Sequence, residues 1–155
     1  MAISLDHAVL LDCLEDKVRF ATKPSAGLFT KIITGLGTRM RALDRAGRSA
    51  QIGALLETQA WTEAALALVQ CELPAWQVHR LVYDGTDWMC SLSRQPCLPD
   101  GLDDGVDATH ESLPLAILMA FLEARRRTAT LRQASTTIPS VAPAAEGTVC
   151  CDNFS

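Results

Sequence analysis

The side chains best suited to hold a metal ion lie in an acidic stretch in the second half of the chain. Asp100, Asp104, Gly105 and Glu111 have the spacing of positions 1, 5, 6 and 12 of an EF-hand loop, where oxygen ligands surround Ca²⁺. Against this, Leu102 stands where the third position needs an oxygen ligand, and two prolines precede the stretch where an EF-hand has its entering helix. We therefore expect a solvated acidic loop, no metal site and no cofactor. Asp100, Asp104 and Glu111 are the residues to test for calcium.

Arginines concentrate in a second stretch, which begins at Arg39. Arg41, Arg45 and Arg48 follow at i, i+4 and i+7, so a helix there would present three guanidinium groups on one face. Such a face suits phosphates or an acidic partner, and it is also what an ordinary solvated helix presents. The net charge of −4 provides no long-range attraction to nucleic acid. A nucleic-acid accessory protein that uses Arg39 to Arg48 is our alternative interpretation.

No pattern of residues indicates catalysis. The three histidines are scattered, no serine or cysteine has a nucleophile context, and no glycine-rich loop precedes a helix in the way that phosphate binding needs. The six cysteines contain no Cys-x-x-Cys pair. The adjacent Cys150 and Cys151 could chelate a soft metal or oxidise, and an incidental pair fits equally well. We expect no catalytic residue and a protein that is not an enzyme, with an enzyme of unknown class as the third hypothesis.

The composition indicates a folded protein. The chain has 155 residues, of which 48% are hydrophobic and 21% are charged, enough to bury a core without disulfides or a metal. The sequence has no apolar run of the roughly 20 residues that a membrane span needs, and its first residues do not have the pattern of a signal peptide. We therefore expect a cytoplasmic protein with reduced thiols that does not bind membranes.

Apolar periodicity and capping residues place the helices. After a first helix that ends near Ala21, Ser25 is expected to cap a second. From Ser49 to Leu73, apolar residues recur on several sides of one long helix. Ser112 should cap a last helix that runs through Arg127 and has an apolar stripe at i, i+3, i+4 and i+7. That stripe consists of Leu115, Leu118, Met119 and Leu122.

The segment from Trp76 to Arg94 predicts a β-hairpin around which the helices pack. A three-residue connection, Tyr83 to Gly85, would give Gly85 a positive φ and pair Val82 with Thr86 and Val78 with Cys90. Alternation then divides the side chains between two faces. The face expected to be buried carries Trp76, Val78, Val82, Trp88, Cys90 and Leu92, and the outer face includes Ser91 and Ser93.

Four short segments resemble bacteriophage proteins that contain the phage ABA sandwich domain. Leu10 to Val18 is similar to the opening helix of that family. Glu63 to Leu68, Leu73 to Trp76 and Leu113 to Leu118 are similar to its helix, to its Pro-small-Trp entry to a hairpin and to its alanine-rich closing helix. The chain differs by inserting a basic stretch from Gly35 to Ser49. The resemblance implies an α-β-β-α packing and a prophage-like origin, and it transfers no catalytic residue.

Together these patterns predict an α+β protein in which a hairpin or small antiparallel sheet packs between helices. We expect one domain over residues 1–130, with N-terminal helices in 1–48, an α-β-β-α core in 49–130 and a disordered tail in 131–155. Our leading interpretation is a small non-catalytic module that binds another protein or has a structural role. The sequence leaves its oligomeric state open.

Overall fold

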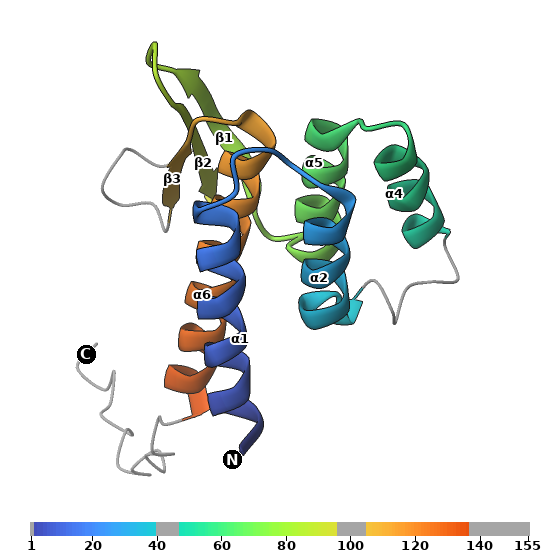
Figure 1. The fold of residues 1–155 in the computed structure, drawn as a ribbon. Coiled ribbons are helices and arrows are strands. Elements are labelled where there is room, and N and C mark those ends of the chain that lie inside the picture. The colour runs from blue at the N-terminus through green and yellow to red at the C-terminus, as the bar shows by residue number, and fades with distance from the viewer. Residues whose placement is uncertain (1, 40–46, 96–104, 137–155) are drawn as a thin grey trace, which may run out of the picture.

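The computed structural model describes residues 2–39, 47–95 and 105–136, and it has the expected α+β class (Figure 1). Three antiparallel strands form one sheet in the order β1-β2-β3, so β2 is central. Helices account for most of the remaining described residues. In chain order the elements are α1 (Ala2–Arg19), α2 (Ala26–Leu36), α4 (Arg48–Glu57), α5 (Trp61–Glu72), β1 (Gln77–Tyr83), β2 (Trp88–Ser93), β3 (Val106–His110) and α6 (Leu113–Thr136).

The helix α6 lies at the centre of the packing. Among the described elements it contacts α1, α5, β2 and β3, and Figure 1 shows α1 running beside it in the opposite direction. Its first half is rich in alanine and large apolar residues, so it can be buried on several sides while neighbours approach closely. The side chains of Leu115, Ile117, Leu118, Phe121 and Leu122 are almost completely buried.

Two of the predicted helix starts are confirmed. The Ser25 side chain accepts a hydrogen bond from the backbone N–H of Leu28 at 3.3 Å, which caps α2. At the start of α6, the Ala116 N–H donates to the Ser112 carbonyl at 2.9 Å, with Pro114 in the first turn.

The prediction of one long helix from Ser49 to Leu73 is wrong, because α4 ends at Glu57 and α5 begins at Trp61. Between them Gln59 has φ of 58°, a left-handed conformation that a helix cannot continue through. The break allows α5 to take its own direction, and the indole of Trp61 stacks on Phe29 of α2 with ring centroids 5.8 Å apart. Apolar residues on several sides of the segment reflect two short helices with different neighbours.

The predicted register of the hairpin is also wrong, although Gly85 has the expected positive φ, of 105°. Tyr83 pairs with Trp88, so the connection has four residues, and the Asp84 carboxylate accepts hydrogen bonds from the N–H groups of Thr86 and Asp87 at 2.9 and 2.8 Å. This side-chain capping stabilises the longer turn. A bulge between Val78 and Arg80 then changes the alternation of β1.

The predicted buried face fails on β1 and holds on part of β2. Val78 and Val82 were expected inside and are exposed, whereas Ser91 and Ser93 were expected outside and are buried. On the side of Cys90 and Leu92 the reason is that α6 packs on β2 and β3, while the substantial contacts of β1 with other described elements are with β2 alone. Ser91 and Ser93 point to the other side of the central strand, where Ser91 donates a hydrogen bond to Asp107 of β3 and Ser93 accepts one from the Gln95 N–H. A sheet face is buried only where a neighbour covers it, and alternation does not say which strands are covered.

The acidic stretch contains a strand that sequence reasoning treated mainly as loop. β3 pairs with β2 through five residues, and its Val106 is buried in the core. The last helix is longer than expected, since α6 ends at Thr136 and residues 131–136 of the predicted tail are helical. Within the described residues, none of the helices has an apolar stretch long enough to cross a membrane.

Candidate functional site

A buried ion pair joins α5 to α6. The carboxylate of Glu72, in the last turn of α5, is fully buried, and the Nη1 atom of Arg125 lies 3.8 Å from it. Glu72 also accepts a hydrogen bond from the backbone N–H of Arg39 at 3.3 Å, and Arg125 donates to the Leu36 carbonyl at 3.0 Å. One carboxylate and one guanidinium therefore fix the end of α2 against both helices.

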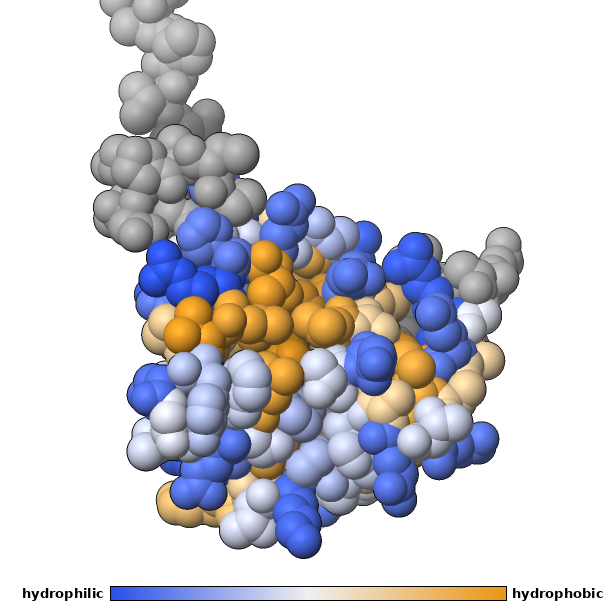
Figure 2. Space-filling model, turned by 90° about the horizontal axis from the view of Figure 1, so that it is seen from above, coloured by the Kyte–Doolittle hydropathy of each residue, from blue (hydrophilic) through white to orange (hydrophobic). Residues whose placement is uncertain are grey.

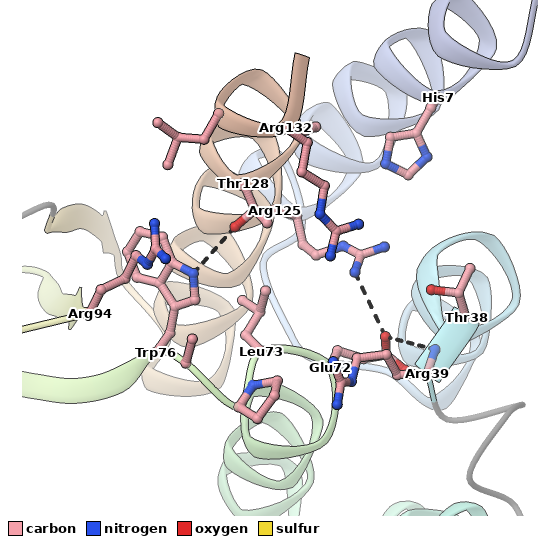
Figure 3. Close-up of a pocket in the computed structure, with 14 residues that line it drawn as sticks. His7, Thr38, Arg39, Glu72, Leu73, Trp76, Arg94, Arg125, Thr128 and Arg132 are labelled. Carbon is pink, nitrogen blue, oxygen red and sulfur yellow. Dashed lines mark hydrogen bonds and ion pairs between the residues drawn. The ribbon is translucent and has the colours of Figure 1, made fainter. Parts of the chain in front are cut away.

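This arrangement opens into a pocket of about 940 Å³ (Figure 3). Its described lining comes from α1, residues 38–39 just after α2, the end of α5 with the α5–β1 connection, the residue after β2 and the second half of α6. The charged and titratable members are His7, Arg39, Glu72, Arg94, Arg125 and Arg132. Four arginines and one glutamate give these lining residues a formal charge of +3 in a chain whose net charge is −4.

The pKa values of two lining groups reflect the positive charge in the pocket. Burial lowers the pKa of the Arg125 guanidinium, Glu72 raises it, and Arg132 lowers it again because the two positive charges repel. Burial and the charge of Arg125 both lower the pKa of His7, which favours its neutral form. The pocket therefore presents positive charge that is held partly away from water.

One wall of the pocket is apolar. Trp76 is nearly buried, and its indole N–H donates to the Thr128 hydroxyl of α6 at 3.3 Å, which satisfies the polar end of the ring. Leu73, Pro74 and Leu131 line the same pocket. In Figure 3, Trp76 and Arg94 lie on one side, Leu73 lies next to them, and the Arg39, Arg125 and Arg132 side chains lie toward the other side. The pocket thus combines a cationic part with an apolar part.

Two arginines of the basic segment found in the sequence, Arg39 and Arg48, are described. Arg39 lines the pocket, whereas Arg48 begins α4 and makes a side-chain hydrogen bond with Cys71, whose thiol pKa is raised chiefly by burial. Arg41 and Arg45 lie outside the described residues. The proposed common face of three arginines is therefore not tested.

The calcium-loop candidate is only partly described. Asp100 and Asp104 lie outside the described residues, and Glu111 is exposed just after β3. In the part of the stretch that is described, five residues are paired in a strand, and the Asp107 carboxylate accepts a hydrogen bond from the Ser91 hydroxyl. Across residues 2–39, 47–95 and 105–136, no cluster of three potential metal ligands is present. Cys150 and Cys151 fall outside these ranges.

A second candidate surface is the free edge of the sheet at β1. All seven residues of the strand are exposed, and four of them are large apolar residues. Their exposed fractions are 37% for Val78, 37% for Leu81, 40% for Val82 and 52% for Tyr83. Figure 2 views the molecule from the end at which Figure 1 shows the hairpin, and apolar residues gather there with polar residues around them.

Sequence reasoning missed the pocket because its arginines come from distant segments. A signal was available in Glu72, an acidic residue that follows an apolar run and directly precedes Leu73 and Pro74. Such a residue, if buried, needs a cationic partner, but the sequence does not say which arginine provides it. Comparisons with protein-family models, with curated proteins and with solved structures each found no match.

Proposed function

We propose that this protein is a non-catalytic protein-binding module, and that the surface it uses is the free edge of β1. The observation that carries the proposal is the exposure of Leu81, Val82 and Tyr83 on a strand that has a neighbour on one side only. Edge strands present unpaired N–H and C=O groups to which another strand can add. Proteins commonly protect such edges with charge or bulges, and β1 has both only in its first half, at Arg80 and the preceding bulge.

The occupant that best fits this edge is a second copy of the chain. Two sheets that join edge to edge around a two-fold axis have antiparallel β1 strands, and residues directly opposite must point to the same face. A pairing centred on Val82 satisfies this condition. It places Leu81 of each copy opposite Tyr83 of the other, which is a favourable aliphatic–aromatic pair.

The charges at the two ends of this pairing are complementary. With Val82 opposite Val82, Arg80 of each copy lies opposite Asp84 of the other. The pKa of Asp84 is lowered by hydrogen bonds from the N–H groups of Asp87 and Thr86 and from the Thr86 hydroxyl, so this residue keeps its negative charge. A pairing centred on Arg80 would instead place the Arg80 side chains of the two copies opposite each other. A pairing centred on Leu81 would place Arg80 of each copy opposite Val82 of the other. Charge therefore selects one register.

The paired region is short, so the association should be weak. Interfaces that bury less than about 1,200 Å² are typical of transient complexes. We expect a monomer–dimer equilibrium that is visible at tens to hundreds of micromolar protein. An affinity of this kind suits a structural role in which many copies of the chain are held close together, as in assembly on a larger scaffold.

The test is the oligomeric state of the wild type and of Val82→Lys by sedimentation velocity between about 10 and 500 µM. The substitution would oppose two lysines at the centre of the interface, so dimer should form in the wild type and be lost in the variant. Val9→Lys is a matched control, because it makes the same substitution at an exposed valine on α1, away from β1. It should dimerise like the wild type.

A charge reversal tests the register. Arg80→Glu should weaken the dimer because it opposes Asp84 with a like charge, whereas Lys31→Glu, the same charge change on an exposed residue of α2, should not. A wild type that is monomeric throughout the range, or a Val82→Lys variant that dimerises as the wild type does, would contradict the proposal. The prophage-like origin remains a separate proposal based on the sequence resemblance alone.

A further inference from the structure

We propose that the pocket between α5 and α6 binds a small organic molecule that carries a phosphate group and an apolar body. The phosphate would lie beside Arg39, Arg125 and Arg132, and the apolar body would lie against Leu73 and Trp76. This site is separate from the β1 edge and does not depend on the dimer.

The positive charge of the described lining residues favours an anionic ligand. The described lining residues carry a formal charge of +3, and the one carboxylate among them, on Glu72, is buried and already interacts with Arg125 and the Arg39 backbone. Positive groups that line a concave surface focus the field inside it, because the protein walls have a low dielectric constant. The remainder of the chain is acidic, so an anion would be drawn to this place on the molecule.

One of the arginines is already held in position. Arg125 has a side chain that is 14% exposed, and it is fixed between the Leu36 carbonyl and Glu72. A guanidinium has five N–H donors, so these contacts leave donors for a ligand. Arg39 and Arg132 are exposed and line the same pocket. Several guanidinium groups around one pocket suit the several oxygens of a phosphate.

The size and the apolar wall favour more than inorganic phosphate. A pocket of about 940 Å³ is at the upper end of the range for small-molecule sites, and such sites combine apolar walls with a few placed polar groups. Trp76 is held by its hydrogen bond to Thr128, so the wall is already formed. Burying an apolar ring there should add affinity to that of the phosphate alone.

The experiment is a calorimetric titration of the whole protein with phenyl phosphate, inorganic phosphate and benzyl alcohol. Phenyl phosphate should bind with a Kd below about 1 mM and at least about fivefold more tightly than inorganic phosphate, while benzyl alcohol should not bind measurably. Arg39→Ala should weaken phenyl phosphate binding by about tenfold. It should not disturb the fold through Glu72, because the hydrogen bond to Glu72 comes from the Arg39 backbone.

Two matched substitutions separate the pocket from general surface charge. Arg132→Ala should weaken binding by a similar factor to Arg39→Ala. Arg19→Ala removes an exposed arginine of α1 that lies outside the pocket and should leave the affinity unchanged. Binding that is only seen above about 10 mM, or that is weakened equally by all three substitutions, would overturn the proposal.

His7 provides a second readout that a structural effect would not mimic. Its pKa is lowered by burial and by the positive charge of Arg125, and the other charged groups among the described lining residues are Arg39, Glu72, Arg94 and Arg132. A bound phosphate should raise the His7 pKa, as measured by NMR titration of its ring protons. No change at saturating phenyl phosphate would place the ligand elsewhere. Duplex DNA that binds more tightly than phenyl phosphate and loses affinity in Arg39→Ala would replace this proposal with the nucleic-acid alternative.

Discussion

The strands β1 and β2 are neighbours in one sheet, yet one is exposed along its whole length and the other is largely buried. Their sequences do not explain the contrast, because both carry large apolar residues. Position does explain it: β2 is the central strand and contacts α6, whereas the substantial contacts of β1 with other described elements are with β2 alone. The apolar residues of β2 therefore belong to the hydrophobic core, whereas those of β1 are exposed at the free edge of the sheet.

The largest expected effect compares two leucines on one face of the sheet. Leu92 of β2 is fully buried, whereas Leu81 of β1 is 37% exposed, and the strand pairing places both on the face that carries Cys90. Leu92→Ala should lower the free energy of unfolding by about 2–5 kcal/mol, because it leaves a cavity under α6. Leu81→Ala should lower it by less than about 1 kcal/mol.

Urea unfolding at low micromolar protein, where the dimer is dissociated, measures both values. Equal losses for the two variants would mean that β1 is as well covered as β2, and the comparison between the strands would then fail.

A smaller effect concerns the thiol of Cys90, which lies opposite Leu81 on β2. Burial, with a contribution from Asp107, raises the pKa of Cys90 to about 12 from its ordinary 9.0. Because the thiolate is easier to form in the unfolded chain, the contribution of Cys90 to the free energy of unfolding should be constant well below pH 9 and should fall between about pH 9 and 12. The loss should be on the order of 1.4 kcal/mol per pH unit at most.

Other groups titrate in the same range, and the pKa of Cys71 is raised as well. The informative quantity is therefore the difference between the wild type and Cys90→Ala, which keeps Cys71. The variant should show a flatter fall of stability above pH 9. If the free energy of unfolding falls with pH in the same way for both proteins, the Cys90 thiol is not buried on β2.

The sequence predicted the class of the fold and several local features, and it failed where tertiary neighbours decide. The starts of α2 and α6 after Ser25 and Ser112 were predicted because the signals for a helix start are local in sequence, and the Ser25 side chain caps α2. The break at Gln59 was missed, since a left-handed glutamine has no strong signal in sequence. The hairpin register was missed because Asp84 caps a four-residue turn and a bulge near His79 changes the alternation.

The candidate sites were harder to predict than the elements. The consecutive arginines Arg125, Arg126 and Arg127 lie in the middle of α6, which continues to Thr136, and they contact three different places. Arg125 binds the end of α2 and Glu72, Arg126 forms an ion pair with Glu15 of α1 at 2.7 Å, and Arg127 donates to the Gly105 carbonyl before β3 at 2.7 Å. Only the packing of the helices gives each arginine its partner.

The central claim is that β1 is an edge at which a second copy of the chain adds, and hydrogen exchange of its backbone amides tests this directly. In an antiparallel edge strand, every second amide points away from the only neighbouring strand. Among Leu81, Val82 and Tyr83, the amides that point away from β2 should exchange rapidly at about 5 µM protein. At about 500 µM they should be protected in the wild type and in Val9→Lys but not in Val82→Lys, because the partner strand accepts their hydrogen bonds. Exchange of these amides that is the same at both concentrations would contradict the account.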